Sequence, residues 1–113
     1  MQSSLILRNL DVDQTGDIGI AVPCALTGYY ISNQNAAVIY VKFYDQVAAA
    51  DENDSPVLTL AIPTASAANM PLDSPAVFFN GLALRATTGV ADNDTGAPDA
   101  NDVVANIYYN EIA

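Results

Sequence analysis

The stretch AAVIYVKFYDQ, residues 36–46, is the most strongly patterned segment of this 113-residue chain. Its two alternating sides both carry large apolar or aromatic side chains: Val38, Tyr40 and Tyr44 on one side, and Ile39, Val41 and Phe43 on the other. Successive side chains of a strand point to opposite faces of a sheet, and β-branched and aromatic residues favour that pleated surface over a helix. The stretch therefore predicts a central β-strand with both faces covered.

Other extended segments lie on both sides of this strand. The predicted strands span residues 3–10, 18–22, 24–32, 57–62 and 103–112. Pro23 and Pro63 each follow one of them, because proline has no N–H to donate to a ladder. Gly28 inside a strand indicates a bulge or a close backbone approach. The short polar turn at residues 33–35 predicts a hairpin between strands 24–32 and 36–46.

The remaining segments are less regular. Residues 64–74 are small and turn-rich, and they predict an ordered surface loop. Residues 76–88 predict two short strands or one bent strand, and because the fragment before Asn80-Gly81 is short, we favour a bend or bulge there over a hairpin turn. The acid-rich connections 47–56 and 89–102 predict loops in solvent, because unpaired carboxylates are costly to bury.

Together these elements predict an all-β fold. Seven to eight strands with no substantial helix indicate an antiparallel β-sandwich with jelly-roll-like closure. The length suits a single β-sandwich domain over residues 1–113, with residues 1–9 as an N-terminal arm or edge strand. The apolar run in MQSSLILRNL is too short for a signal peptide or a membrane span, so we expect neither export by that route nor a membrane partner.

The composition excludes several classes of function. Thirteen acidic residues face three basic ones, for a net charge of −10. This charge repels phosphate backbones and anionic membranes, so no nucleic acid partner is expected, and a basic surface or a cation is the better match. The chain has no histidine and only one cysteine, Cys24. Internal disulfides, triads and Cys–His nucleophiles are excluded, so we expect no catalytic residues, no cofactor and no enzyme activity.

The acidic loops offer weak candidates for a Ca²⁺ site: Asp11, Asp13, Asp17, Asp92 and Asp94. Alternating carboxylates in a loop are typical oxygen ligands of Ca²⁺. The spacing departs from the EF-hand pattern, however, because neither loop places its glycine and its final glutamate where that pattern needs them. Solvated turns rich in aspartate are therefore the favoured interpretation, with a specific cation as the alternative.

Three pairs of adjacent aromatic residues occur in predicted strands: Tyr29-Tyr30, Phe78-Phe79 and Tyr108-Tyr109. Neighbours along a strand point to opposite faces, so one ring of each pair is expected in the core. The other ring is then left for solvent or for another chain, and tyrosine suits such interfaces because it joins apolar area to a polar tip. We expect at least one pair to contribute to an interface.

Three segments carry a resemblance to a known group: AAVIYVKFYD, SPVLTLAIP and the block FFNGLALRATTGVADNDTGAPDANDVVANIYY at residues 78–109. They resemble small β-sandwich structural proteins of tailed-bacteriophage virions, and most of all the head decoration, or cement, proteins. The resemblance implies a homo-oligomer, a trimer or a dimer, bound to the major capsid protein on the capsid exterior of the virion, where it stabilises contacts between capsid subunits. The alternatives are a tail- or fibre-associated module that binds carbohydrate or Ca²⁺, and a head–tail connector component.

Candidate interface residues come from three parts of the chain. Leu5, Leu7 and Arg8 lie near a chain end that is free to reach outward. Tyr40 and Tyr44 form one side of the central strand, and Tyr108 belongs to an aromatic pair. These six residues are the predicted contacts with a partner chain.

Overall fold

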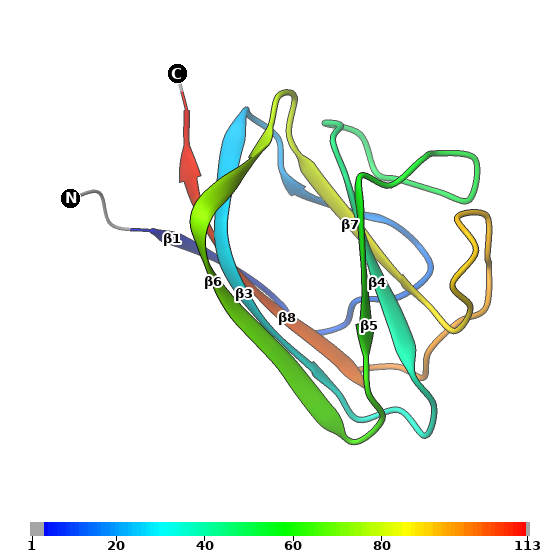
Figure 1. Ribbon diagram of the computed structural model, residues 1–113. Helices are drawn as coiled ribbons and strands as arrows, with labels where there is room; N and C mark the ends of the chain where they lie inside the picture. The colour runs from blue at the N-terminus through cyan, green and yellow to red at the C-terminus, as the bar shows by residue number, and fades with distance from the viewer. Residues whose placement is uncertain (1–3, 113) are drawn as a thin grey trace.

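Eight antiparallel β-strands form the regular structure of residues 4–112, the part of the chain that this computed structural model describes (Figure 1). They are β1 (Leu5–Asn9), β2 (Asp17–Ile20), β3 (Cys24–Asn33), β4 (Ile39–Tyr44), β5 (Leu58–Ile62), β6 (Ser66–Phe78), β7 (Leu82–Thr87) and β8 (Val103–Glu111). The described residues contain no helix, hence none that could cross a membrane. The predicted all-β class with seven to eight strands is confirmed.

The strands build two four-stranded sheets that pack face to face (Figure 1). Sheet A has the order β1-β8-β3-β6, and sheet B has the order β2-β7-β4-β5. Successive strands pass from one sheet to the other, except that β4 and β5 are neighbours in sheet B. This order is that of an eight-stranded jelly roll, and the antiparallel β-sandwich prediction is confirmed.

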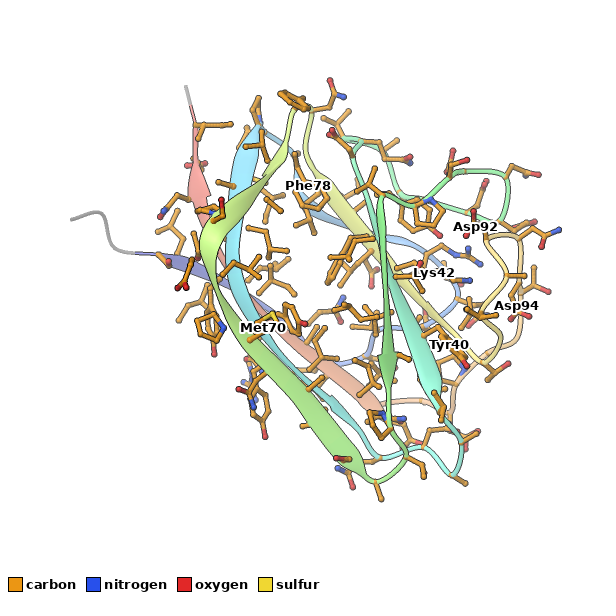
Figure 2. All side chains as sticks on the ribbon, viewed as in Figure 1. Tyr40, Lys42, Met70, Phe78, Asp92 and Asp94 are labelled. Carbon is orange, nitrogen blue, oxygen red and sulfur yellow. The ribbon has the colours of Figure 1, made fainter. Side chains whose placement is uncertain are left out.

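The hydrophobic core lies between the two sheets. Its fully buried side chains include Leu26 and Ile107 from sheet A, and Phe43 and Leu84 from sheet B. Phe78 points into the same space from the end of β6 (Figure 2). Each sheet therefore buries one alternating row of side chains against the other sheet, as sandwich packing requires.

The strand β4 is central, as its sequence predicts. It lies between β7 and β5 in sheet B. Its core-facing residues Ile39, Val41 and Phe43 are fully buried, and on its other face Lys42 and Tyr44 are fully buried as well. The prediction that both faces of this strand are covered is confirmed.

The predicted hairpin between residues 24–32 and 36–46 is wrong, because β3 belongs to sheet A and β4 to sheet B. The connection between them is a corner held by the buried side chain of Asn33. Its Nδ2 donates to the carbonyls of Ala37 and Ile62, each at 3.0 Å, and its Oδ1 accepts from the N–H of Asn35 at 2.8 Å. The apolar rows of β3 and β4 face each other across the core instead of lying side by side.

The predicted loop at residues 64–74 is also wrong, because most of it belongs to β6. This strand pairs with β3 from Ser66 to Phe78. It is an edge strand of sheet A, with β3 as its one neighbour in the described sheet. An edge strand tolerates proline, because one of its sides takes no part in a ladder. Pro71 and Pro75 therefore interrupt the strand-like sequence pattern without ending the strand.

The segment around Asn80-Gly81 is neither a hairpin turn nor a bulge. It joins β6 in sheet A to β7 in sheet B, so it is a second corner of the sandwich. The bulge predicted at Gly28 is confirmed by a shift in register between Leu26 and Gly28. At the N-terminus, β1 is an edge strand of sheet A, and residue 3 of the predicted strand lies outside the described residues.

Candidate functional site

The outer face of sheet A carries two rows of side chains that run across its four strands. One row aligns Ile6, Tyr108, Gly28 and Pro71, which come from β1, β8, β3 and β6. In such a ladder, residues directly opposite each other point to the same face. This row contains no charged side chain, and Ile6 is 65% exposed.

The neighbouring row aligns Arg8, Asn106, Tyr30 and Asn69. Tyr30 is 43% exposed, and the Asn106 side-chain amide donates to the Tyr30 carbonyl at 3.3 Å. Arg8 is exposed and is the single charge of this row. These two rows thus join apolar and aromatic side chains with uncharged amides, and Arg8, on an edge strand, is their one charged residue.

A hollow of about 270 Å³ opens in this face beside Gly28, whose neighbours Met70, Pro71 and Tyr108 line it. A Cβ atom at Gly28 would lie 2.9 Å from the Met70 carbonyl oxygen and 3.1 Å from a ring carbon of Tyr108, so the glycine lets the β6 backbone and the Tyr108 ring pack closely beside the hollow. The hydroxyls of Ser4 and Thr27 hydrogen-bond at 2.7 Å on one side of it. The walls of this Gly28 hollow include Tyr30, Tyr108, Asn69 and Pro71.

A rigid corner lies at one end of the sandwich, between β6 and β7. The carboxylate of Asp45 accepts hydrogen bonds from three successive backbone N–H groups, those of Phe79 at 3.0 Å, Asn80 at 2.8 Å and Gly81 at 3.5 Å. Burial alone would raise the pKa of Asp45, but these hydrogen bonds outweigh it and hold the pKa below its ordinary value. Residues 79–81 form what we call the Phe79 corner.

The aromatic pairs divide between core and surface as their spacing predicts. Phe78 is 2% exposed, whereas Phe79 is 73% exposed, the highest value among the large hydrophobic side chains described as exposed. Tyr29 is likewise buried while Tyr30 is exposed. In the third pair, Tyr109 packs against the core and Tyr108 lines the Gly28 hollow.

The outer face of sheet B is covered by loops and contains two buried cations. Lys42 on β4 and Arg85 on β7 are directly opposite each other, and both are fully buried. Arg85 donates to the Gln14 carbonyl at 2.9 Å, the Asp94 carbonyl at 2.8 Å and the Tyr44 hydroxyl at 3.1 Å. It therefore ties the loop before β2 and the loop before β8 to the sheet.

Lys42 is less well anchored than Arg85. Its ammonium donates to the Ala91 carbonyl at 2.5 Å and points toward the loop that carries Asp92 and Asp94 (Figure 2). Burial lowers the pKa of Lys42, the charge of Arg85 lowers it further, and Asp94 and Asp92 partly offset both effects. Lys42 and Arg85 leave Arg8 as the one cation exposed among the described residues.

Three of the five aspartates predicted as Ca²⁺ candidates, Asp11, Asp13 and Asp94, accept hydrogen bonds from loop backbone. Asp11 accepts from the N–H of Asn101, Asp13 accepts from the N–H of Thr15, and Asp17 accepts from the side-chain amide of Asn9. Asp94 accepts from the N–H groups of two loop glycines, and Asp92 lies near it on the same loop (Figure 2). Within residues 4–112, no group of three or more Asp, Glu, Cys or His side chains is arranged to hold a metal ion.

The six predicted interface residues fall in three environments. Leu5 and Arg8 are exposed on β1, and Tyr108 lies beside the Gly28 hollow. Leu7 is partly buried and packs against the core. Tyr40 is partly buried, and Tyr44 is fully buried by the chain's own loops, which leaves it no surface for a partner.

Sequence reasoning did not identify the Gly28 hollow or the fixed Phe79 corner. A bulge at Gly28 was predicted, but the hollow needs tyrosines from two strands, β3 and β8, that pair only in the folded sheet. The corner depends on Asp45, which is 34 residues from Phe79 in the sequence. The one local signal for Phe79 was its position in an aromatic pair before Asn80-Gly81.

Comparison with known proteins returns little sequence similarity. No protein-family model matches the chain, and no curated protein matches it. Among solved structures, it is similar to a chain from the appendages of Bacillus endospores, which form disulfide-linked pili. The alignment covers 99% of this chain and 93% of that chain, at 13% sequence identity and a TM-score of 0.41.

These comparisons overturn the predicted assignment to phage heads. They give no support for a virion protein: no family model and no curated protein matches, and the solved structure described above comes from Bacillus endospore appendages. The prediction of a capsid decoration protein is therefore wrong, as are its predicted partner, the major capsid protein, and its predicted location on the capsid exterior. The same correction applies to the phage tail, fibre and connector alternatives. The quoted segments are strand and turn sequences, which unrelated β-sandwiches share.

Proposed function

We propose that this protein is a structural subunit without catalytic activity, which assembles with copies of itself through the outer face of sheet A. The observation that carries the proposal is the distribution of charge. Eleven of the thirteen acidic residues lie outside the four strands of sheet A, and those strands carry only Arg8, Asp73 and Glu111 as charged residues.

Charge decides which surface of this protein can receive another copy. Two copies with a net charge of −10 each repel one another wherever their acidic loops approach. The outer face of sheet A avoids this repulsion and presents Ile6, Tyr30 and Tyr108 instead. Apolar and aromatic surface with few charges is typical of the centre of protein interfaces.

Four ionisable side chains have structural partners within the chain. Arg85 binds backbone carbonyls of two loops, and Lys42 binds a carbonyl in one of these loops. Asp45 binds backbone N–H groups of the Phe79 corner. Asp94 fixes its own loop through two N–H groups. These partners support a structural role, since a general acid or base must present its ionisable group to a substrate.

Assembly through this face is non-covalent. Bacillus endospore pili are disulfide-linked, whereas Cys24, the one cysteine of this chain, is fully buried. Burial, with smaller contributions from the negative charges of Asp45 and Glu111, raises the pKa of Cys24 to about 11. A protonated and inaccessible thiol forms disulfides poorly, so the contacts between copies rest on apolar packing.

Sedimentation velocity over a range of concentrations tests the proposal. We expect the wild-type chain to associate, and Ile6→Asp to weaken association at least about tenfold by placing a carboxylate in the shared face. The matched control is Val57→Asp, which adds the same charge at a residue of similar exposure, 63% against 65%, just before β5 of sheet B. A wild-type chain that stays monomeric, or two variants that associate equally well, would overturn the proposal.

A further inference from the structure

We infer that Phe79 of one copy inserts into the Gly28 hollow of the next copy. This inference rests on the proposed self-assembly and names the two surfaces that meet. Phe79 is the projecting group, and the hollow between Tyr30 and Tyr108 is its receptor. Each copy carries both parts, at different places on its surface.

Phe79 has the properties of an anchor residue. Its ring is 73% exposed, and its backbone is fixed because the Asp45 carboxylate binds the N–H groups of Phe79, Asn80 and Gly81. An aromatic side chain presented on a rigid turn loses little conformational freedom on binding. Large aromatic residues of this kind dominate the affinity of many interfaces.

The Gly28 hollow matches a phenyl ring in size and chemistry. Its volume is about 270 Å³, and a cavity of about 150 Å³ lined by apolar side chains already holds a benzene ring. Tyr30 and Tyr108 in its walls provide ring faces and edges for a third aromatic group.

A single copy cannot fill its own hollow with its own Phe79. Pro71, in the wall of the hollow, and Phe78, beside the corner, are seven residues apart on β6. At the rise of a β-strand this separation is about 23 Å, far beyond the reach of a side chain. The hollow of one copy therefore receives Phe79 from another. Such a contact joins two different surfaces, so it repeats into an open chain or closes into a ring.

The charges of the two surfaces are complementary on the β1 side of the hollow. The end of the sandwich that carries Phe79 also carries Asp45 and Glu111, since Cys24 of β3 pairs with Phe78 on one side and Glu111 on the other. Arg8, the exposed cation of the described residues, lies on β1 in the row next to the hollow, whereas the exposed acid Asp73 lies on β6, two residues from Pro71. Insertion of Phe79 brings the acidic end of one copy toward the basic edge of another.

Complementary variants test this contact. Phe79→Ser removes the projecting ring and keeps the hollow, whereas Tyr30→Glu places a carboxylate in the hollow and keeps the ring. We expect each variant alone to associate at least about 30-fold more weakly than wild type, and their equimolar mixture to form a 1:1 dimer in sedimentation velocity. The matched control Val90→Ser, at a residue that is 62% exposed on an acidic loop, should associate like wild type. Circular dichroism and thermal unfolding establish that each variant is folded.

Cross-linking provides a second measurement that does not depend on weakened assembly. Asn80→Cys, which keeps the Phe79 ring on the same corner, and Asn69→Cys, mixed under oxidising conditions, should form a disulfide between copies, while Asn80→Cys mixed with Val57→Cys should not. Association of Phe79→Ser at the wild-type level, with no cross-link to Asn69→Cys, would overturn the Phe79 contact and leave self-assembly standing. A wild-type chain that remains monomeric overturns both.

Discussion

Lys42 and Arg85 lie side by side on adjacent strands, β4 and β7, and both are fully buried. Like charges directly opposite each other in a sheet destabilise it. The two side chains differ in what they hold: Arg85 binds two loop carbonyls and a hydroxyl, whereas Lys42 binds one carbonyl. The stability of the loops over sheet B therefore depends mainly on Arg85.

Replacing each cation by methionine should have unequal effects. We expect Arg85→Met to lower the free energy of unfolding by about 3 kcal/mol, because it removes the guanidinium donor from the partly buried carbonyls of Gln14 and Asp94 and from the buried hydroxyl of Tyr44. Lys42→Met should change that free energy by less than about 1 kcal/mol, since the lost hydrogen bond is offset by relief from the charge of Arg85. Urea unfolding measures both, and an equal loss in the two variants would contradict this account.

The Asp45 carboxylate should make stability fall at low pH. Its pKa is lower in the folded protein than its ordinary value of 3.8, so the unfolded state binds the proton more readily. Its contribution to stability is thus present above pH 3.8 and is lost as the pH falls through the folded pKa. Asp45→Asn should cost about 1 kcal/mol at neutral pH.

That cost should shrink once the pH lies well below 3.8, because wild type then also carries an uncharged side chain at this position. Urea unfolding of wild type and Asp45→Asn at the two pH values gives the difference directly. A destabilisation by Asp45→Asn that is the same at both pH values would show that the carboxylate charge does not hold the Phe79 corner.

Gly16 should not tolerate a side chain. A Cβ atom there would lie 1.9 Å from the carbonyl oxygen of Ala50, which is backbone and cannot swing away. We expect Gly16→Ala to separate the loop before β2 from the loop after β4 and to cost at least about 2 kcal/mol. Thr15→Ala is the matched control, since the Thr15 backbone N–H, not its side chain, bonds to Asp13. Thermal unfolding that is equal in the two variants would contradict the close approach.

Self-association should strengthen with salt. Copies with a net charge of −10 repel one another over about 30 Å at 0.01 M ionic strength, and over only about 8 Å at 0.15 M. Apolar packing through the outer face of sheet A is not weakened by this screening. Sedimentation velocity at the two ionic strengths should therefore give tighter association at the higher one, and weaker association there would indicate an interface dominated by ion pairs.

Local patterns in the sequence predict the strands where apolar residues alternate. The two buried rows of β4 follow from the alternation of side chains along a strand, and the bulge in β3 follows from the presence of Gly28. The strand β6 was missed because it is an edge strand with two prolines and few large apolar residues, so its pairing with β3 leaves little trace in its own sequence. The β3–β4 hairpin was predicted from a short turn, yet the buried Asn33 directs the chain across to the other sheet.

The function was predicted wrongly for a related reason. Strand and turn motifs reflect the needs of a sandwich, which many unrelated proteins share, so they do not identify a partner. The candidate contact depends instead on Tyr30 and Tyr108 meeting around Gly28, and on Asp45 fixing a corner that exposes Phe79. These juxtapositions join residues far apart in the chain.

The amino-acid sequence by itself determined that this protein is an acidic all-β chain with a central strand at residues 36–46 covered on both faces, because alternation and charge are properties of neighbouring residues. Only the tertiary structure decided what covers that strand. Its inner face packs on sheet A, and its outer face, with Lys42 and Tyr44, lies under loops of the same chain. Local sequence cannot specify this covering, because it depends on long-range contacts: the packing of distant segments determines which faces of the sheets remain free for a partner.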